Sequence, residues 1–297
     1  MTEPSTTIAP PAKTAVLSRR RFFVQMLAAA ALPVAAGYYT YNVEPFWPRF
    51  QEIPIHIKGL PKSFDGFRIA QVTDMHGGHI PFEFLAKTLA RVEDLKPDLV
   101  LFTGDLIHHD PTAIDRVAAL MKTFSMPTVA SFGNHDYGPY RGEDDPYDPQ
   151  LADKLRVAIT NAGCTVLVNQ SKPIEHSDGR LWLVGLDDLW FGEFNPKLAF
   201  ENVPSNERVI ALSHNPDTAE MLADHHPDLI LSGHTHGGQL RLPFYGALRL
   251  NIARAQYDWG LFQLPNSQLY VSSGVGFILR MRFNCRPEVP VFRLVGV

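Results

Sequence analysis

Length, composition and charge describe a globular chain with a sizeable core and argue against a polyanion-binding protein. The chain has 297 residues, of which 45% are hydrophobic and 20% are charged, a balance typical of soluble domains. The formal net charge is −4, whereas a nucleic-acid-binding protein normally carries a basic excess or a basic stripe. The two cysteines, Cys164 and Cys285, are not in a metal-ligand spacing. We interpret them as free, partly buried thiols, with a disulfide after export as the alternative.

Residues 1–43 predict a disordered leader followed by an export signal or a membrane anchor. The polar leader ends at Ser18-Arg19-Arg20-Arg21-Phe22-Phe23, and an apolar stretch follows from Val24 to about Gly37. Charged, apolar and small residues in this order are typical of a secretory signal, and the arginine pair before Phe-Phe resembles the twin-arginine type. The alternative is a basic turn that leads into a buried helix.

The sequence leaves open whether this signal is cleaved. Ala35-Ala36-Gly37 offers small residues to a peptidase, whereas Tyr38–Tyr41 extend the apolar segment to about 18 residues, near the lower limit for spanning a bilayer. Trp47 and the tyrosines suit an interfacial belt. We favour a retained anchor. The expected partner is the twin-arginine export machinery, and the expected location is the periplasm or the outer face of the cytoplasmic membrane.

Residues 44–297 predict a single α/β domain. The stretch from Glu44 to about Phe67 is rich in proline and is interpreted as an edge strand with a connector. Apolar runs then alternate with stretches of helical spacing, which suggests a sheet buried on both faces. The predicted strands are 67–73, 98–103, 127–132, 164–168, 181–186, 208–212 and 229–231, and the predicted helices are 82–95, 114–124 and 151–162. The tail from Gln239 to Val297 predicts antiparallel strands that close a second sheet.

Five apolar runs end in polar residues that a hydrophobic core would not select. They are Asp74-Met75-His76, Gly104-Asp105, Gly133-Asn134-His135-Asp136, Ser213-His214-Asn215 and Gly233-His234-Thr235-His236-Gly237. Ligands of open α/β sheets bind beyond the carboxyl ends of the strands, so we expect these side chains to converge. Carboxylate, amide and imidazole donors without thiolate suit Mn, Fe or Zn.

The spacing within these segments predicts which side chains share a side. Asp74 and His76 are two residues apart, so both point the same way if the segment is extended. The same holds for His234 and His236, unless the neighbouring glycines bend the chain. Two metal ions roughly 3.5–4 Å apart need a bridging carboxylate, and Asp105 is the natural bridge.

In this order, D-x-H, G-D, G-N-H-D, H and G-H-T-H resemble the motifs of the calcineurin-like metallophosphoesterases, over about residues 67–239. Ser213–Asp217, Ser232–Gln239 and Tyr270–Gly274 also look like segments of the bacterial branch with an N-terminal anchor, which includes phosphodiesterases and lipid-precursor pyrophosphatases. The resemblance implies a four-layer αββα sandwich of two mixed β-sheets flanked by helices.

Carried over position by position, the resemblance implies two divalent metal ions. One ion would be held by Asp74, His76 and His236. The other would be held by Asn134, His214 and His234, with Asp105 as the bridge. His135 would be the general acid, and Asn134 would also fix the geometry of its neighbour.

The implied reaction is hydrolysis of phosphomonoester, phosphodiester or pyrophosphate bonds. Two cations lower the pKa of a bridging water, present hydroxide in line with phosphorus and neutralise the developing charge. His135 would protonate the departing oxygen.

One position departs from the family pattern. Many relatives read G-D-x-x-D, where the second Asp orients the catalytic histidine, and here that position is His108. Either Asp110 or Asp136 takes over this role, or the backbone alone orients His135. We interpret His79, His108 and His109 as loop residues, with a supporting role behind the ligands as the alternative.

The substrate rim is predicted from two segments, the acidic and aromatic loop 137–147 and the tail 277–283. Arg280 and Arg282 could meet phosphate oxygens, although a strand with one solvated face is the favoured reading of that tail. A retained anchor makes a phospholipid or nucleotide-lipid substrate plausible. The competing hypotheses are an amide or lactam hydrolase, whose H-x-H-x-D-H cluster is absent, and a non-catalytic metal-binding or membrane-assembly protein.

Overall fold

The computed structural model describes residues 19–138, 150–250, 252–254 and 256–297. The chain divides into two units, Met1–Tyr39 and Thr40–Val297. The predicted leader lies outside the described residues, as does most of the loop 137–147.

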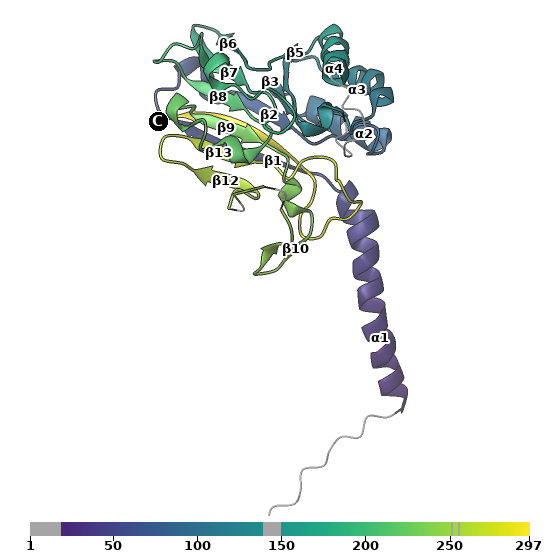
Figure 1. The fold of residues 1–297 in the computed structure, drawn as a ribbon. Coiled ribbons are helices and arrows are strands. Elements are labelled where there is room, and N and C mark those ends of the chain that lie inside the picture. The colour runs from purple at the N-terminus through teal and green to yellow at the C-terminus, as the bar shows by residue number, and fades with distance from the viewer. Residues whose placement is uncertain (1–18, 139–149, 251, 255) are drawn as a thin grey trace, which may run out of the picture. The chain divides into compact units, whose positions relative to one another are not determined.

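The first unit contains the helix α1 (Arg19–Tyr38), which continues as a π-helix over Tyr39–Val43 (Figure 1). The segment Arg19–Phe46 is long and apolar enough to cross a membrane, with a mean hydropathy of 1.5 in its best window. A signal sequence has the same properties.

The second unit contains two six-stranded mixed sheets. The first sheet has the order β1-β14-β2-β3-β4-β5, and all its neighbours are parallel except β14 and β2. Its strands are β1 (Arg49–Ile57), β2 (Arg68–Val72), β3 (Leu99–Thr103), β4 (Thr128–Ser131), β5 (Thr165–Val166) and β14 (Glu288–Gly296). The β1 strand is at the edge, as its proline-rich sequence predicts.

The second sheet has the order β12-β13-β9-β8-β7-β6, with antiparallel pairs at both edges. Its strands are β6 (Gln170–His176), β7 (Gly179–Gly185), β8 (Val209–Leu212), β9 (Leu229–Ser232), β12 (Gly260–Gln263) and β13 (Gln268–Val271). A small hairpin of β10 (Arg241–Leu242) and β11 (Gly246–Ala247) lies outside both sheets.

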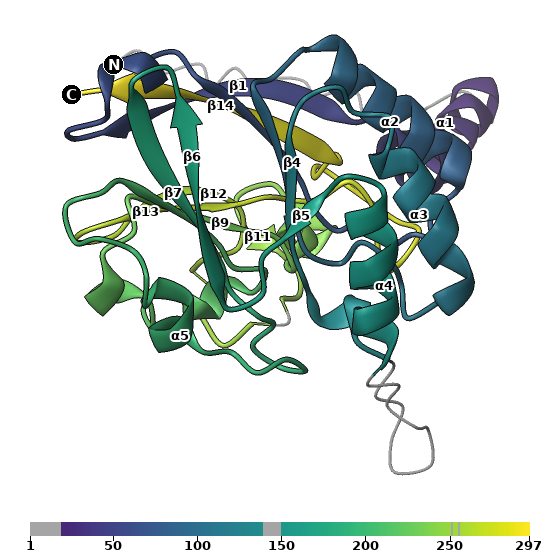
Figure 2. The ribbon, with the colours of Figure 1, turned by 90° about the horizontal axis from the view of Figure 1, so that it is seen from above.

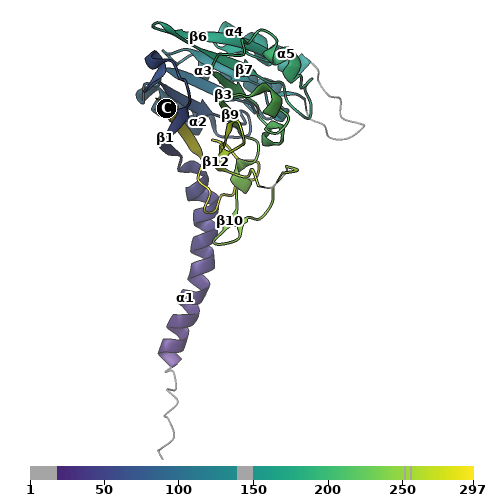
Figure 3. The ribbon, with the colours of Figure 1, turned by 90° about the vertical axis from the view of Figure 1, so that its left-hand side faces the viewer.

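Helices cover the outer faces of the two sheets, which makes four layers. Figure 2 shows α2, α3 and α4 along the first sheet and α5 on the side of the second sheet, and Figure 3 shows the layers from another side. Their bounds are α2 (Phe82–Asp94), α3 (Ile114–Met121), α4 (Gln150–Asn161) and α5 (Pro196–Phe200). The predicted four-layer α/β fold is confirmed.

The α2 helix illustrates how the sequence produces these layers. Leu85, Leu89 and Val92 recur at helical spacing and are buried against the first sheet. The helix ends where Lys96 adopts a left-handed conformation (φ 47°) and Pro97 follows, because proline cannot continue it.

Two parts of the fold differ from the predictions. The tail does not all join the second sheet: β12 and β13 do, but β14 inserts between β1 and β2 of the first sheet. The β6 strand was not predicted, because its sequence, Gln170 to His176, is polar and mostly exposed. It is stabilised by its antiparallel pairing with β7.

Candidate metal centre

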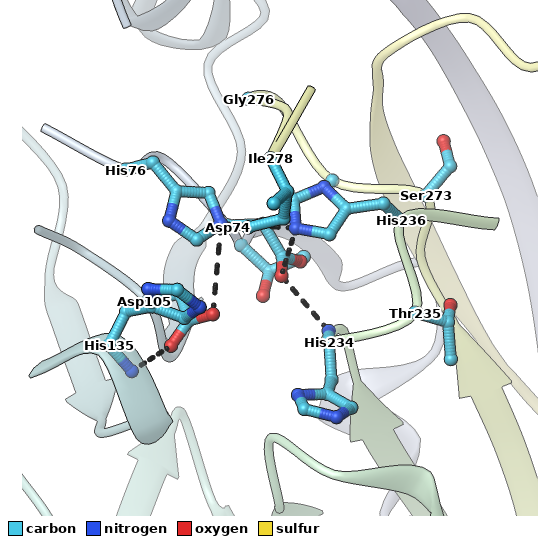
Figure 4. Close-up of polar contacts among 12 residues, drawn as sticks. Asp74, His76, Asp105, His135, His234, Thr235, His236, Ser273, Gly276 and Ile278 are labelled. Atoms are coloured by element: carbon cyan, nitrogen blue, oxygen red, sulfur yellow. Dashed lines mark hydrogen bonds and ion pairs between the residues drawn. The ribbon is translucent and has the colours of Figure 1, made fainter. Parts of the chain in front are cut away.

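The predicted ligands meet where five strands end, on loops that follow β2, β3, β4, β8 and β9. Two groups each gather three donor atoms within 4.8 Å of one another: Asp74, His76 and His236, and Asp105, His214 and His234. Asn134 lies beside the second group, because its Oδ1 is 2.8 Å from Nδ1 of His234. Figure 4 shows the first group together with Asp105 and His234 of the second group.

Asp105 lies between the two groups. Its Oδ2 is 3.1 Å from His214 Nε2 and 3.7 Å from His76 Nε2. Its Oδ1 accepts a hydrogen bond of 2.8 Å from the backbone N–H of His135. A single carboxylate therefore touches members of both groups and also the loop that carries His135.

In the first group, the imidazoles of His76 and His236 face each other. Their Nε2 atoms are 3.0 Å apart, and His236 Nε2 is 3.4 Å from Asp74 Oδ1. Burial lowers the pKa of both histidines well below its usual value, with further lowering by His135 and by Arg282 respectively. Both rings are therefore neutral at pH 7, which is the form of imidazole that binds metal.

In the second group, His214 faces the carboxylate of Asp105. His214 is buried and its Nδ1 donates to the carbonyl of Thr103 at 2.8 Å, so the lone pair of Nε2 faces the carboxylate of Asp105. Burial alone would lower the pKa of His214, but the charge of Asp105 raises it to about 10. A proton relieves the contact between these two acceptors, and a metal ion would relieve it equally well.

The remaining polar atoms also fit a metal ion. Asp74 is fully buried, and its Oδ2 has no hydrogen-bond partner among the described residues. Burial raises the pKa of Asp74 to about 7, and a buried carboxylate without a counter-ion is costly. The donors are oxygen and nitrogen, while Cys164 and Cys285 are free and buried, as predicted. This donor set fits Mn, Fe or Zn.

The backbone of the site is strained at the predicted ligands. Left-handed φ angles occur at Asp74 (55°), His76 (47°), Asp105 (53°), His234 (70°) and His236 (50°). Such angles are uncommon for residues other than glycine and cluster at functional sites. Residues 74–76 and 234–236 are therefore not extended, so the condition for a shared side by strand alternation is not met, and the alternative of a bent chain applies at 234–236. These turns, rather than strand alternation, aim the ligands.

Two glycines allow the loops to approach this closely. A Cβ atom on Gly104, whose φ is +91°, would lie 2.5 Å from His214 Nδ1. A Cβ atom on Gly133 would lie 2.4 Å from Asp105 Oδ1. Any side chain at either position would displace a predicted ligand, so both glycines are part of the site.

The groups around His135 bear on which residue orients its ring, because His108 stands where many relatives have an aspartate. Asp136 accepts hydrogen bonds from the N–H groups of Leu106, Ile107 and Gly133, and Asp110 caps Thr112. Among the described residues, Nδ1 of His135 has no hydrogen-bond partner, so neither carboxylate orients the ring through that atom. The ring of His108 instead stacks on that of His135, with centroids 4.6 Å apart and planes at 18°.

His108 also contacts a predicted ligand directly. Its Nδ1 is 3.0 Å from Nδ1 of His76. His79 stacks on the opposite side of His108, with centroids 4.5 Å apart. His108 and His79 therefore support the site rather than acting as simple loop residues, while His109 bonds the carbonyl of Tyr137 and lies 4.2 Å from the His135 ring.

The structure contradicts the proposed role of Arg282. This guanidinium is fully buried and donates to the backbone carbonyls of Ser273, Gly276 and Cys285. It ties together the loop behind the site and cannot reach a substrate. Residues 277–283 are also not a strand. Arg280 lies over the rings of Tyr41 and Phe46.

A sixth strand end, which was not predicted as part of the site, also carries acidic residues beside it. Asp187 and Asp188 follow β7 and are buried, and the rings of Trp190 and His234 meet edge to face with centroids 4.4 Å apart. Burial raises the pKa of Asp188, whose Oδ1 holds the backbone of this loop at Trp190 and Phe191. The signal was present, since the apolar run 181–186 also ends in two carboxylates.

The chain is similar in sequence to known proteins along most of its length. The family model described as calcineurin-like phosphoesterase matches residues 67–238. The uncharacterised metallophosphoesterase YkuE of Bacillus subtilis is 33% identical, over 94% of this chain and 98% of its own. The phosphodiesterase YaeI of Escherichia coli is 34% identical, over 94% and 100%. The UDP-2,3-diacylglucosamine pyrophosphatase LpxG of Chlamydia trachomatis is 29% identical, over 89% and 94%. With such a match over more than half its length, and with two candidate metal-binding groups at its strand ends, the chain belongs to the calcineurin-like phosphoesterase family.

Proposed function

We propose that the residues gathered at the strand ends hold two divalent metal ions for phosphoester hydrolysis. One ion is held by Asp74, His76 and His236. The other is held by Asn134, His214 and His234, with Asp105 between the two. The observation that carries this assignment is the position of Asp105 Oδ2, within 3.7 Å of His76 and 3.1 Å of His214.

When bound, the two ions supply an activated water and positive charge beside the phosphate. The carboxylate of Asp105 accepts a hydrogen bond of 2.8 Å from the backbone N–H of His135, the proposed general acid. The same carboxylate lies between the two groups of proposed ligands. His135 donates a proton to the departing oxygen. Burial lowers the pKa of His135 to about 4, and a phosphate anion beside the ring raises it, because an opposite charge favours the protonated form.

Metal analysis combined with a substrate panel tests this proposal. The purified chain should hold about two metal ions, as a dinuclear centre requires, and should hydrolyse bis-p-nitrophenyl phosphate, p-nitrophenyl phosphate or both. Reloading the metal-free protein with Mn, Fe or Zn identifies the active metal. A chain that binds one ion or none, or that hydrolyses no phosphoester with any of these metals, would contradict the assignment.

We also propose that the physiological substrate is a lipid-linked phosphodiester or pyrophosphate. The support is twofold: the apolar segment Arg19–Phe46 can anchor the enzyme to a membrane, and one relative is named as a pyrophosphatase of UDP-2,3-diacylglucosamine. Turnover of a vesicle-embedded phosphodiester should exceed that of a soluble analogue with the same leaving group. Equal turnover would remove the basis for this substrate class.

Export by the twin-arginine route and retention of α1 as an anchor complete the proposal. Lysine retains the charge of arginine but not its planar guanidinium. The double substitution Arg20→Lys and Arg21→Lys should therefore block export, which cell fractionation would detect as loss of protein on the periplasmic side. Export at the normal level would exclude this route. Release of the wild-type chain into the soluble periplasmic fraction would exclude a retained anchor.

A further inference from the structure

Exposed apolar side chains of the second unit gather in three short segments. Among the described residues of Thr40–Val297, more than half of the exposed large apolar side chains belong to residues 41–47, 242–248 and 278–281. They are Tyr41, Val43, Trp47, Leu242, Phe244, Tyr245, Leu248, Ile278, Leu279 and Met281. Phe244 is fully exposed and Leu279 is 65% exposed. Apolar side chains collected in this way usually mark an interaction site.

The three segments are joined by specific contacts. Arg280 lies over the ring of Tyr41 at 4.6 Å, and the backbone N–H of Arg282 donates to the carbonyl of Thr40 at 3.0 Å. The backbone N–H of Arg241, at the base of the hairpin, donates to Phe283 at 2.9 Å. The segments therefore form one surface, which we call the apolar rim. Figures 1 and 3 show the β10 hairpin projecting from the body.

The apolar rim is connected to the metal centre through Gln239. This residue follows His236 by three positions, and its Nε2 donates to the carbonyls of Leu279 (2.6 Å) and Met281 (2.8 Å). On the other side, the N–H of Gly276 donates to the carbonyl of Asp74 at 2.7 Å, and Ile278 lies in front of the ligands in Figure 4. A molecule held at the rim is therefore close to the metal-binding side chains.

The position of the rim along the chain points to a lipid bilayer as its occupant. The segment 41–47 continues directly from α1, the one helix among the described residues that is long and apolar enough to cross a membrane. Thr40, whose carbonyl is bonded to Arg282, is the first residue of the second unit. A bilayer that holds α1 therefore begins within a few residues of the rim. Tyr, Trp and Arg side chains on the rim suit the interfacial region of such a bilayer.

We propose that the apolar rim docks onto the surface of the lipid bilayer that contains α1, with Phe244, Tyr245 and Leu279 inserted among the lipids. The inference rests on the proposed anchor and extends the proposed lipid substrate, because it places the entrance of the metal centre at the membrane surface. Interfacial insertion of a few apolar side chains supplies the orientation that the anchor alone does not.

A fluorescent label tests the docking directly. Both native cysteines are buried, and burial raises the pKa of Cys164 to about 11 and also raises that of Cys285, so neither competes for a thiol reagent. The variant Phe244→Cys in the full chain is labelled with an environment-sensitive dye and reconstituted into phospholipid vesicles. Val157→Cys, an exposed apolar position away from the rim, is the matched control.

The emission of the dye at position 244 should shift to the blue in vesicles, and the emission at position 157 should not. The shift should persist when lipid is added at constant protein, because the occupant is lipid. A shift that disappears on such dilution would assign the rim to a second copy of the chain. A dye that remains in water at both positions would also overturn the proposal.

Activity separates this inference from the proposed function. The double variant Phe244→Ser, Leu279→Ser should lower kcat/KM for a vesicle-embedded phosphodiester by about tenfold, with bis-p-nitrophenyl phosphate hydrolysed at the wild-type rate. The matched control Val157→Ser, Met221→Ser should change neither activity. Equal turnover of vesicle substrate by both double variants would refute the docking role. If the wild-type protein does not hydrolyse the soluble substrate at all, the result would instead refute the proposed metal centre.

Discussion

Two buried polar clusters lie close together in this protein, and they differ in what they leave unsatisfied. Around Glu288, Oε1 accepts hydrogen bonds from Trp259, Tyr270 and Ser273, and Oε2 pairs with Arg49 at 2.6 Å. Around Asp74, by contrast, Oδ2 has no partner among the described residues. Both carboxylate oxygens of Glu288 therefore have partners within the chain. The second leaves an acceptor that the proposed metal ion would satisfy.

The difference separates a structural role from a functional one. A buried carboxylate whose acceptor sites are filled by the protein holds its loops in place, whereas one left unsatisfied costs free energy unless something else binds. The second cluster also carries the left-handed ligands Asp74, His76 and Asp105, so strain and missing partners coincide. The following predictions test whether the two clusters divide stability and activity in this way.

The largest effect is expected from Asp105→Asn. The amide is nearly isosteric but lacks the negative charge that faces His214 and His76, so hydrolysis should fall by about 10³-fold or more, since loss of one electrostatic contact in an active site already costs about 10²–10³-fold. The far-UV circular dichroism spectrum should match that of the wild type. Retained turnover in a folded Asp105→Asn protein would remove the bridging role of this residue.

Removal of metal should give the next largest effect. Chelation of tightly bound ions withdraws about 3–4 kcal/mol of stabilisation when their concentration exceeds Kd by 100- to 1,000-fold. For a body of this size the melting temperature should fall by roughly 5–15 °C. Differential scanning calorimetry with and without chelator measures the shift, and reloading with Mn, Fe or Zn should reverse it. An Asp105→Asn variant should respond less, because it starts with weakened metal binding.

The sequence predicted the second cluster better than the first. Asp74, Asp105, Asn134, His214 and His236 were recognised because each follows an apolar run, and local pattern is what a single sequence displays. Glu288 was not recognised as the centre of a cluster, because its partners Arg49 and Trp259 are 239 and 29 residues away. The insertion of β14 between β1 and β2 was missed for the same reason.

The conformation of the loops that carry the predicted ligands could not be predicted from the sequence either. The left-handed φ of Asp74 depends on bonds made by other segments, such as its N–H to the carbonyl of Gly104 at 3.1 Å. Local propensity alone predicts an extended backbone after a strand, and tertiary contacts override it here. Strain of this kind becomes visible only once the fold is known.

The substitution Glu288→Gln should lower stability and spare activity, which is the opposite of the effect expected from Asp105→Asn. It removes the charge that pairs with Arg49 and places an amide among donors, so the free energy of unfolding should fall by about 2–3 kcal/mol. Turnover per folded molecule should stay within about threefold of the wild type, because Glu288 touches no predicted ligand. Denaturant titration and kcat on the same preparation measure both quantities. A fall in turnover per folded molecule of much more than threefold would show that Glu288 supports activity as well as stability.

His108 gives the smallest and most specific effect. If His76 binds metal through Nε2, its Nδ1–H must donate to Nδ1 of His108, 3.0 Å away, and this bond fixes the orientation of the His76 ring. Loss of such a supporting bond typically weakens metal binding by about tenfold or more. His108→Ala should therefore raise the metal Kd by about tenfold. His108→Asp, which restores an acceptor, should recover most of that affinity.

Metal titration of both His108 variants distinguishes this role from simple packing. A packing role predicts that both the Ala and the Asp variant bind metal weakly, because neither side chain replaces the ring that lies between His79 and His135. A role as acceptor predicts that Asp succeeds, because a carboxylate accepts the His76 proton at least as well as an imidazole does. Recovery by Asp would show that either a histidine or an aspartate at this position can accept the proton of the His76 ring nitrogen.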